Sequence, residues 1–414
     1  MSDDNNVSTK KQDIHDDNQH VPELRFPGFT DEWKSKKGKF LFEIFGGGSF
    51  KSEDSMINGV KWLKIANVGI NKIKNDEISY LPYEYLKKYD KFILKEGDLV
   101  IALTRPILNK ELKISFVNNE FNNSLLNQRV GKIESKNKII LKFIYYLLQL
   151  PRNIYYMESR IVGTDPPNLS NKDLLNQTYI LPSIPEQYKI SNFISKIDRK
   201  IDLLEKTLCL HQKYEKQLRE NIFNFKMNNI NFKRYSLGDI AEIKKGFTPS
   251  TKNPKYWNYG KYHWLSIADM DKKYITNSKQ KISEEAIKNK EIIKKDTLIM
   301  SFKLTIGKLA ILKEDMYTNE AIANFTWKND KISTEYMYFY LKTLNIKKYG
   351  SQAAKGITLN NDTLNAIPIM LPEFNIQLNI VNILLTFNKK IELINEKLNN
   401  LKYFKKFLLQ KMFI

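Results

Sequence analysis

Two segments of the sequence come close to motifs that bind phosphate or hold a base for chemistry. Residues 46–52, Gly-Gly-Gly-Ser-Phe-Lys-Ser, resemble a phosphate-binding loop, but Phe50 stands where a glycine must precede the lysine. Residues 165–168, Asp-Pro-Pro-Asn, approach the Asp-Pro-Pro-aromatic loop of enzymes that methylate amino groups. Asn168 replaces the aromatic ring that would stack on a flipped base. Each segment therefore lacks a residue that its chemistry requires.

Carboxylate–lysine triplets, which occur in metal-dependent nucleases, also appear twice. Glu111-Leu112-Lys113 and Glu242-Ile243-Lys244 have the right terminal spacing, but no Pro-Asp precedes either triplet. With 27% charged residues, such triplets arise by chance. The two histidines near the start, His15 and His20, have no neighbouring cysteine or histidine cluster to complete a metal site. The sequence predicts neither a catalytic constellation nor a metal site.

The charge balance points to a polyanionic partner instead. The formal net charge is +21 and the pI is near 9.5, which favours nucleic acid over a membrane surface. Basic, hydroxyl and aromatic residues recur near the expected strand ends, where arginine and lysine can reach guanine and serine or threonine can hold phosphates. The predicted DNA-binding residues are Ser49, Lys51, Lys64, Thr104, Arg105, Arg129, Arg152, Lys245, Thr248, Ser250, Lys252, Tyr256, Trp257 and Lys303.

These candidates lie in two globular segments that a long internal repeat separates. Residues 181–223 recur without a gap at 371–413, a shift of 190 positions. Both copies keep a ladder of apolar residues in steps of three and four, which is typical of a coiled-coil helix. Blocks before the helices recur as well: residues 62–67 match 264–269, and 143–148 match 336–341.

This repeat defines the expected domain organisation. Residues 1–21 are predicted to be a disordered acidic tail, 22–180 a first globule, and 181–227 a central helix. Residues 228–370 form the second globule and 371–414 a C-terminal helix. The predicted fold class is α+β: two mixed α/β globules alternate with two long helices that pair as an antiparallel coiled coil, with pseudo-two-fold symmetry. One cysteine, Cys209, excludes an internal disulfide, and the sequence indicates neither a membrane span nor a signal peptide.

The long helices have more apolar surface than one seam requires. At about 1.5 Å per residue, a helix of about 40 residues spans roughly 60 Å, which is more than one DNA turn of roughly 34 Å. The helices could therefore set the distance between two sites that the globules read. The predicted partner-binding residues are Gln187, Ile201, Leu208, Tyr214, Gln377, Ile391, Leu398, Phe404 and Phe407.

Taken in order, these features resemble the specificity subunit of type I restriction–modification systems over residues 22–414. The resemblance rests on residues 22–29 with Trp33, on 127–130, on 246–264, and above all on the Leu-Pro-Ser-Ile-Pro-Glu-Gln run at 181–187. The second helix departs from this pattern at Ile376 and Asn388, which take the places of Glu186 and Asp198.

The resemblance implies a non-catalytic subunit whose two target recognition domains each read one half of a split, asymmetric DNA site. The helices would fix the spacer and dock two modification subunits. Double-stranded DNA, these methyltransferase subunits and restriction subunits are the expected partners. This chain would bind no cofactor, while S-adenosylmethionine, ATP and Mg²⁺ would act in the partner subunits. The expected location is the bacterial cytoplasm, at the nucleoid through DNA binding.

Two other functions remain open on the sequence. The chain could be a self-sufficient DNA methyltransferase or nuclease, which binding of S-adenosylmethionine by the chain alone would reveal. It could also be a coiled-coil scaffold without a DNA role. DNA affinity that did not weaken with rising salt would favour the scaffold, because phosphate contacts release counterions.

Overall fold

The computed structural model describes residues 20–161, 166–224, 231–303, 305–353 and 356–414. Most of the predicted acidic tail lies outside these residues. The chain forms two compact units, one of residues 1–203 and 398–414 and the other of 204–397. The boundaries fall inside the two long helices, α5 (Ile184–Ile222) and α9 (Phe374–Lys411). Each unit therefore contains a segment of both helices.

The first unit is built on a four-stranded antiparallel sheet in the order β2-β10-β5-β8. Its strands are β2 (Phe42–Gly46), β10 (Val130–Ser135), β5 (Leu99–Ala102) and β8 (Ile114–Phe116). The smaller sheets are β1 (Lys34–Lys37) with β11 (Thr178–Leu181), β6 (Ile107–Leu108) with β7 (Glu111–Leu112), and β4 (Ser79–Leu81), β3 (Val60–Leu63) and β9 (Leu125–Leu126). The helices are α1 (Tyr85–Lys88), α2 (Leu141–Leu148), α3 (Pro151–Ile161) and α4 (Asn171–Asn176).

The second unit repeats this plan with a five-stranded sheet in the order β13-β20-β17-β18-β15. Its strands are β13 (Ala241–Lys245), β20 (Ile322–Trp327), β17 (Leu298–Ser301), β18 (Leu309–Leu312) and β15 (Tyr274–Ile275). The smaller sheets are β12 (Lys233–Ser236) with β23 (Pro368–Leu371), β21 (Ser351–Ala353) with β22 (Gly356–Thr358), and β16 (Gln280–Ile282), β14 (Tyr262–Leu265) and β19 (Tyr317–Thr318). The helices are α6 (Leu237–Ile240), α7 (Thr334–Thr343) and α8 (Asn361–Asn365).

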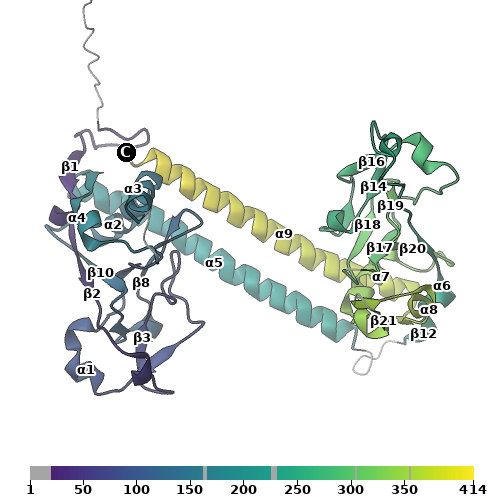
Figure 1. Ribbon diagram of the computed structural model, residues 1–414, viewed down its shortest axis with the longest axis horizontal. Coiled ribbons are helices and arrows are strands. Elements are labelled where there is room, and N and C mark those ends of the chain that lie inside the picture. Colours follow the sequence, from purple (N-terminus) through teal and green to yellow (C-terminus); the bar gives the residue numbers. More distant parts are fainter. Residues whose placement is uncertain (1–19, 162–165, 225–230, 304, 354–355) are drawn as a thin grey trace, which may run out of the picture. The chain divides into compact units, whose positions relative to one another are not determined.

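The apolar strand runs explain the central sheets. Every residue of β5 and β17 is buried, as continuous Leu, Ile, Val and Met runs require when both faces of a strand are covered. In the first unit α2, α3 and α4 lie at one end of the large sheet, and the three-stranded sheet lies at the other end with α1 beside it (Figure 1). In the second unit α6, α7 and α8 lie at one end and the three-stranded sheet at the other (Figure 1). In the first unit the loop after β2 packs on α1 through Phe50, whose ring centroid lies 5.8 Å from that of Tyr85.

The ends of the long helices complete the cores. Phe413, which follows α9, stacks on Phe143 of α2 in the first unit, with ring centroids 5.2 Å apart. Its counterpart Phe223, which follows α5, packs edge-on against Tyr336 of α7 in the second unit at 5.7 Å. Both phenylalanines are buried. The repeat thus places equivalent aromatic rings against equivalent helices, and the C-terminus of the chain belongs to the core of the first unit.

Candidate nucleic-acid interface

In the first unit, three loops meet where the four-stranded sheet ends. The Gly48 N–H donates to the Leu126 carbonyl at 2.8 Å, and the Gln128 N–H donates back to the Gly48 carbonyl at 2.9 Å. The Leu103 N–H donates to the Arg129 carbonyl at 2.9 Å. These bonds bring together the segments that carry Ser49, Arg105 and Arg129, whose side chains are all exposed.

Thr104 makes its hydrogen bond inside the unit. It is buried, and its hydroxyl donates to Oδ1 of Asn168 at 2.6 Å. The next residue, Arg105, has a left-handed backbone with φ of 47°, and its N–H donates to the Pro167 carbonyl at 2.7 Å. A DNA contact by Thr104 stays a prediction, and its hydroxyl is bonded inside the unit. It fixes the loop on which Arg105 stands.

The structure adds two basic residues that sequence reasoning missed. Lys113 lies close enough to Lys74 and Arg105 that both oppose its protonation. Its pKa is lowered first by burial and then by the repulsion of these two cations. Clustered cations are the arrangement that a phosphate backbone neutralises. Lys74 and Lys113 come from separate loops, so neither their spacing nor a motif could have found them.

The remaining basic candidates of this unit have other contacts. Lys51 is exposed and begins a short turn, with its N–H bonded to the Asp54 carboxylate at 3.0 Å. Lys64 is half-buried, with its ammonium 5.2 Å from the centroid of the Trp62 ring. Arg152 lines a cavity with Thr178, where β1 pairs with β11. The structure thus groups Arg152 with the two-stranded sheet and leaves Arg105 and Arg129 as the basic candidates at the sheet end.

The second unit repeats the backbone of this sheet end with other side chains. The Phe247 N–H donates to the Thr318 carbonyl at 2.8 Å, and the Phe302 N–H donates to the Ala321 carbonyl at 3.0 Å. Ala321 therefore stands where the first unit has Arg129, and Glu320 stands where it has Gln128. The Glu320 carboxylate accepts a hydrogen bond from the Thr248 hydroxyl.

Two predicted lysines flank one aromatic ring at this sheet end. The ammonium groups of Lys245 and Lys303 lie 5.1 and 5.7 Å from the centroid of the buried Phe302 ring. A cation over an aromatic face is stabilised by the ring quadrupole, which holds both lysines at the sheet end. Both side chains are exposed, so their charges remain available to a phosphate.

The loop before β14 contains the other candidates of the second unit. Ser250 and Lys252 are exposed, and Tyr256 is half-buried. Trp257 packs edge-on against Trp264, with ring centroids 5.0 Å apart, and its Nε1–H donates to the Ser250 carbonyl at 3.1 Å. Trp257 is therefore an anchor of this loop, since both its ring and its N–H have partners inside the unit.

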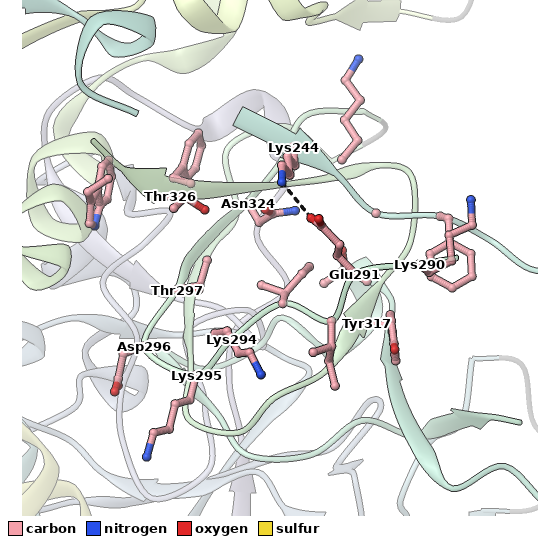
Figure 2. Close-up of a pocket in the computed structure, with 18 of the residues that line it drawn as sticks. Lys244, Lys290, Glu291, Lys294, Lys295, Asp296, Thr297, Tyr317, Asn324 and Thr326 are labelled. Atoms are coloured by element: carbon pink, nitrogen blue, oxygen red, sulfur yellow. Dashed lines mark hydrogen bonds and ion pairs between the residues drawn. The ribbon is translucent and has the colours of Figure 1, made fainter. Parts of the chain in front are cut away.

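A lysine-rich cleft of about 1100 Å³ adjoins the same sheet end (Figure 2). Its floor includes Asn324 and Thr326 of β20, and Lys244 of β13 reaches Glu291 across it, with an Nζ–Oε2 distance of 2.8 Å. The lysines that line it are Lys244, Lys245, Lys290, Lys294, Lys295 and Lys328. By strand register, the first unit has the exposed Phe45 where the second has Lys244. This lysine of the cleft has no basic counterpart in the first unit.

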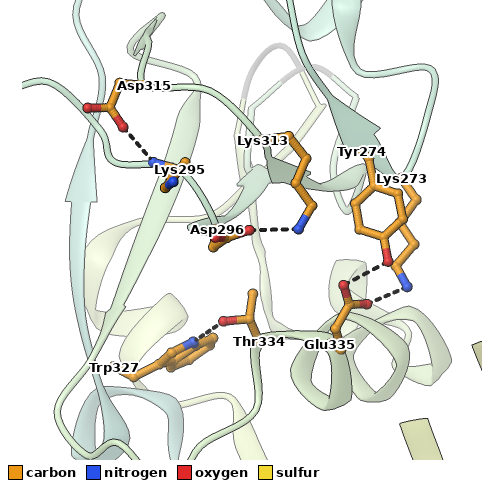
Figure 3. A network of polar contacts seen from close by, with 9 residues as sticks. All are labelled: Lys273, Tyr274, Lys295, Asp296, Lys313, Asp315, Trp327, Thr334 and Glu335. Atoms are coloured by element: carbon orange, nitrogen blue, oxygen red, sulfur yellow. Dashed lines mark hydrogen bonds and ion pairs between the residues drawn. The ribbon is translucent and has the colours of Figure 1, made fainter. Parts of the chain in front are cut away.

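Ion pairs hold one wall of the cleft in place (Figure 3). Asp296 accepts from Lys313 at 2.6 Å, and the Lys295 N–H donates to Asp315 at 2.8 Å. Behind this wall, Glu335 at the start of α7 accepts from the Tyr274 hydroxyl at 2.8 Å and pairs with Lys273. Among the residues that the structure describes, no group of three or more His, Cys, Asp or Glu side chains could hold a metal ion.

A family model for the type I restriction modification DNA specificity domain matches residues 30–209 and 229–403. The chain belongs to this family. Each match spans one globule and part of the long helix that follows it. The resemblance inferred from the residues is therefore confirmed.

Curated relatives are named as specificity subunits of type I restriction enzymes. The type I restriction enzyme MjaVIII specificity subunit of Methanocaldococcus jannaschii is 35% identical over 205 residues, which are 49% of this chain and 48% of that protein. The MjaIX specificity subunit of the same organism is 32% identical over 170 residues, or 39% and 38% of the two chains. The EcoR124I/EcoR124II specificity subunit of Escherichia coli is 24% identical over 281 residues, or 63% and 67%. The matches thus span less than half the length of each M. jannaschii relative.

Solved structures show the same fold. The S subunit of a type I restriction–modification system from M. genitalium aligns over 95% of this chain and 99% of its own, with a TM-score of 0.61 at 17% identity. A chain from a study of complex assembly and conformational transition in a type I R-M system aligns over 93% and 98%, with a TM-score of 0.54 at 14% identity. The two repeated domains and long helices are therefore those of a type I specificity-subunit fold.

The apolar helix residues predicted to bind partners differ in exposure. Ile201 and Leu398 are buried, Leu208 and Ile391 are half-buried, and Tyr214, Phe404 and Phe407 are exposed. Within the first unit Asp198 of α5 pairs with Lys405 of α9 at 2.7 Å, and within the second Tyr214 packs on Phe387 at 5.6 Å. The exposed aromatic residues therefore remain the candidates for contact with another subunit.

The two glutamines make internal hydrogen bonds in this specificity-subunit fold. Gln187 is buried, accepts from the Ile140 N–H at 3.2 Å and donates to the Pro182 carbonyl at 2.9 Å. Gln377 is equally buried, accepts from the Ser333 N–H at 2.9 Å and donates to the Pro372 carbonyl at 2.9 Å. Gln187 joins the start of α5 to the start of α2, and Gln377 joins the start of α9 to the start of α7. A partner contact by either glutamine stays a prediction, and the internal hydrogen bonds give each another role.

Internal contacts also explain the two departures in the second helix. Glu186 is buried and accepts from Nε and Nη2 of Arg25 at 2.7 and 2.8 Å. Asp198 accepts from the Tyr146 hydroxyl at 2.6 Å. The second helix has Ile376 and Asn388 at these places, and Ile376 packs against the apolar core of its unit. Glu186 thus ties α5 to the first globule through its ion pair with Arg25.

Proposed function

We propose that this chain is the DNA specificity subunit of a type I restriction–modification complex. Each globule would act as a target recognition domain, residues 22–180 for one half of a bipartite asymmetric site and 228–370 for the other. One observation carries the proposal: two sheet ends have matching backbone hydrogen bonds but different side chains. Such a pair suits two readers of different sequences, because base contacts depend on side chains.

Charge supports DNA as the partner of both sheet ends. The first has Arg105, Arg129 and the Lys74–Lys113 pair, and the second has Lys245 and Lys303 beside a cleft lined with lysines. Glu320 at the second sheet end could accept a hydrogen bond from a cytosine amino group. The unequal chemistry of Arg129 and Glu320 favours an asymmetric site over a palindrome.

In this proposal the long helices pair as an antiparallel coiled coil that sets the spacer. The Asp198–Lys405 and Tyr214–Phe387 contacts support antiparallel pairing, because the residue number rises on α5 as it falls on α9. Inserting four residues between Leu203 and Leu208 should then lengthen the spacer of the methylated site and leave both half-sites unchanged. An unchanged spacer would mean that the helices do not set the distance.

The exposed Tyr214, Phe404 and Phe407 are proposed to dock two modification subunits. Those subunits would bind S-adenosylmethionine and methylate adenine, while restriction subunits would use ATP and Mg²⁺. The chain itself would be non-catalytic and would work in the bacterial cytoplasm, at the nucleoid. No helix in the described part of the chain is both long and apolar enough to cross a membrane.

Mapping DNA methylation in cells with and without this gene tests the proposal. A single bipartite adenine motif should be methylated only when the gene is present together with its modification subunit. The purified chain alone should not bind S-adenosylmethionine. A methylation pattern that did not change with the gene would contradict the specificity role, and cofactor binding by the isolated chain would favour a self-sufficient methyltransferase.

A further inference from the structure

An apolar side chain stands fully in solvent at the same place in both units. Ile57 is 91% exposed and Tyr259 is 97% exposed, the highest values among the large apolar residues that the structure describes. Each lies five residues before the tryptophan of a central strand, Trp62 of β3 or Trp264 of β14. Single exposed apolar residues are ordinary, but two at matching places in domains whose loops otherwise differ indicate a shared use.

The backbone around Tyr259 keeps its side chain outside the core. Tyr259 has a left-handed φ of 56°, and the next residue, Gly260, packs directly on the Lys281 backbone. The Lys261 N–H donates to the Ile282 carbonyl at 3.0 Å, which fixes the chain after the turn. Because Trp257 and Trp264 already fill the core beneath the loop, the tyrosine ring has no apolar site to enter.

The backbone around Ile57 is fixed in a similar way. The Met56 N–H donates to the Tyr80 carbonyl at 3.0 Å, just before Ile57. Two residues later Gly59 has φ of 157° and lies so close to the Leu81 carbonyl that a Cβ would clash with it. Ile57 therefore lies in a short segment held to β4 at both ends, with its side chain in solvent.

The loop that carries Tyr259 contains basic residues. Residues 246–268 contain Lys252, Lys255 and Lys261, all exposed, and contain no aspartate or glutamate. The first tip has Lys51 and Lys61 but also Glu53 and Asp54. Glu284 and Glu285 follow Ser283, whose N–H donates to the Tyr256 carbonyl at 3.0 Å, so this tip also has carboxylates nearby. An exposed ring flanked by lysines suits stacked bases between phosphates, because the ring takes the base and the cations take the backbone.

We propose that Ile57 and Tyr259 are wedges, each of which inserts between base pairs of the half-site that its own globule reads. This inference rests on the proposed function and deepens it. Isoleucine is one of the residues with which proteins unstack a base step, and tyrosine stacks on exposed bases. The insertion would unstack one step in each half-site and would supply sequence preference through the ease of deforming that step.

A duplex that carries the methylated motif tests the proposal, with 2-aminopurine placed in turn at positions of each half-site. The full complex of this chain with its modification subunits should raise the probe's fluorescence at one step in each half. Ile57→Ala should remove the rise in one half only, and Tyr259→Ala in the other half only. Each change should weaken binding about 5- to 150-fold, the range for loss of one stacking side chain.

Tyr155→Ala is the matched control, because Tyr155 is a 74% exposed aromatic residue on α3 of the first unit, and it should change neither signal nor affinity. Bases flipped by the modification subunits would still fluoresce in every variant. Tight specific binding with unchanged fluorescence in Ile57→Ala and Tyr259→Ala would overturn the wedges while leaving the proposed function intact. So would loss of binding to the modification subunits, since that would make the tips protein contacts. Absence of any methylated motif would instead overturn the proposed function.

Discussion

The two sheet ends share a backbone and differ in charge. In the first unit the turn before β10 presents Gln128 and Arg129, and the same two positions before β20 are Glu320 and Ala321. The matching Leu103–Arg129 and Phe302–Ala321 hydrogen bonds show that the loop frame does not depend on these side chains. Backbone bonds therefore set where the side chains stand, and the side chains are free to differ in what they recognise.

The starts of the long helices show the same contrast inside the protein. Gln187 and Gln377 make equivalent hydrogen bonds, whereas the neighbouring positions are an ion-paired Glu186 and an apolar Ile376. An ion-paired carboxylate and a partly buried aliphatic side chain can fill the same position. The two arrangements respond differently to truncation, because removal of one partner of an ion pair leaves the other charge without its partner.

The largest expected effect follows from breaking that pair. Glu186→Ala should lower the unfolding free energy of the first unit by about 3–5 kcal/mol, because it leaves the Arg25 charge poorly solvated and unpaired. The double variant Arg25→Met with Glu186→Ile, which imitates the second helix, should recover most of this loss. Hydrogen exchange of the amides of α2 and of the start of α5 measures both.

The matched control is Glu220→Ala, whose carboxylate is exposed and lies 3.9 Å from Lys216 on the same helix. It should change stability by less than about 0.5 kcal/mol. If the amides of α2 exchanged as slowly in the Glu186→Ala variant as in the wild-type chain, the ion pair would not hold the first unit together. A loss of protection in α7 of the second unit would show that the two units are not independent.

A smaller effect is expected from making the first sheet end resemble the second. Arg129→Ala should relax base preference in one half of the methylated motif, at a cost of about 1–3 kcal/mol in discrimination. Methylation mapping of the variant measures this directly. Arg160→Ala, which removes an arginine that lies over the Tyr156 ring on α3, should leave the motif unchanged. Relaxation in both halves would break the assignment of one half-site to each globule.

The smallest effect should come from the cations behind Arg105. Lys113→Gln should reduce the dependence of log affinity on log salt by about one unit, with the recognised motif unchanged, because a phosphate contact carries no sequence information. DNA binding measured over a salt series checks this. Lys136→Gln is the control, since Lys136 pairs with Glu43 at 3.2 Å and should leave the slope as it is. A changed motif would mean that Lys113 contacts a base.

The repeat made much of the fold predictable. The recurring block at 62–67 begins in β3 and the block at 143–148 lies in α2, and their copies lie at β14 and α7. The helix ladders placed α5 and α9 within a few residues of their ends. Local patterns sufficed here because apolar spacing within one segment determines which face of that segment can be buried.

The site was predictable only as a set of loops. Arg105 and Arg129 were expected at strand ends and do meet there, whereas Thr104, Gln187 and Gln377 turned out to be internal ties. Their residue types suit either role, since a polar side chain beside a strand or helix can bond outward or inward. Which of these it does depends on whether a partner lies within hydrogen-bond distance, and that partner is distant in the sequence.

The sequence by itself determined that the chain has two like halves and that each half ends in a long helix, and its charge of +21 favoured a polyanionic partner. Those conclusions follow from the composition, from the spacing of the apolar residues and from the duplication. They require no knowledge of contacts between residues distant in the sequence. Only the tertiary structure decided that Lys74 and Lys113 join Arg105, that Glu186 belongs to Arg25, and that Ile57 and Tyr259 stand in solvent. These facts arise where separate loops meet, and a loop's position is set by the sheet beneath it.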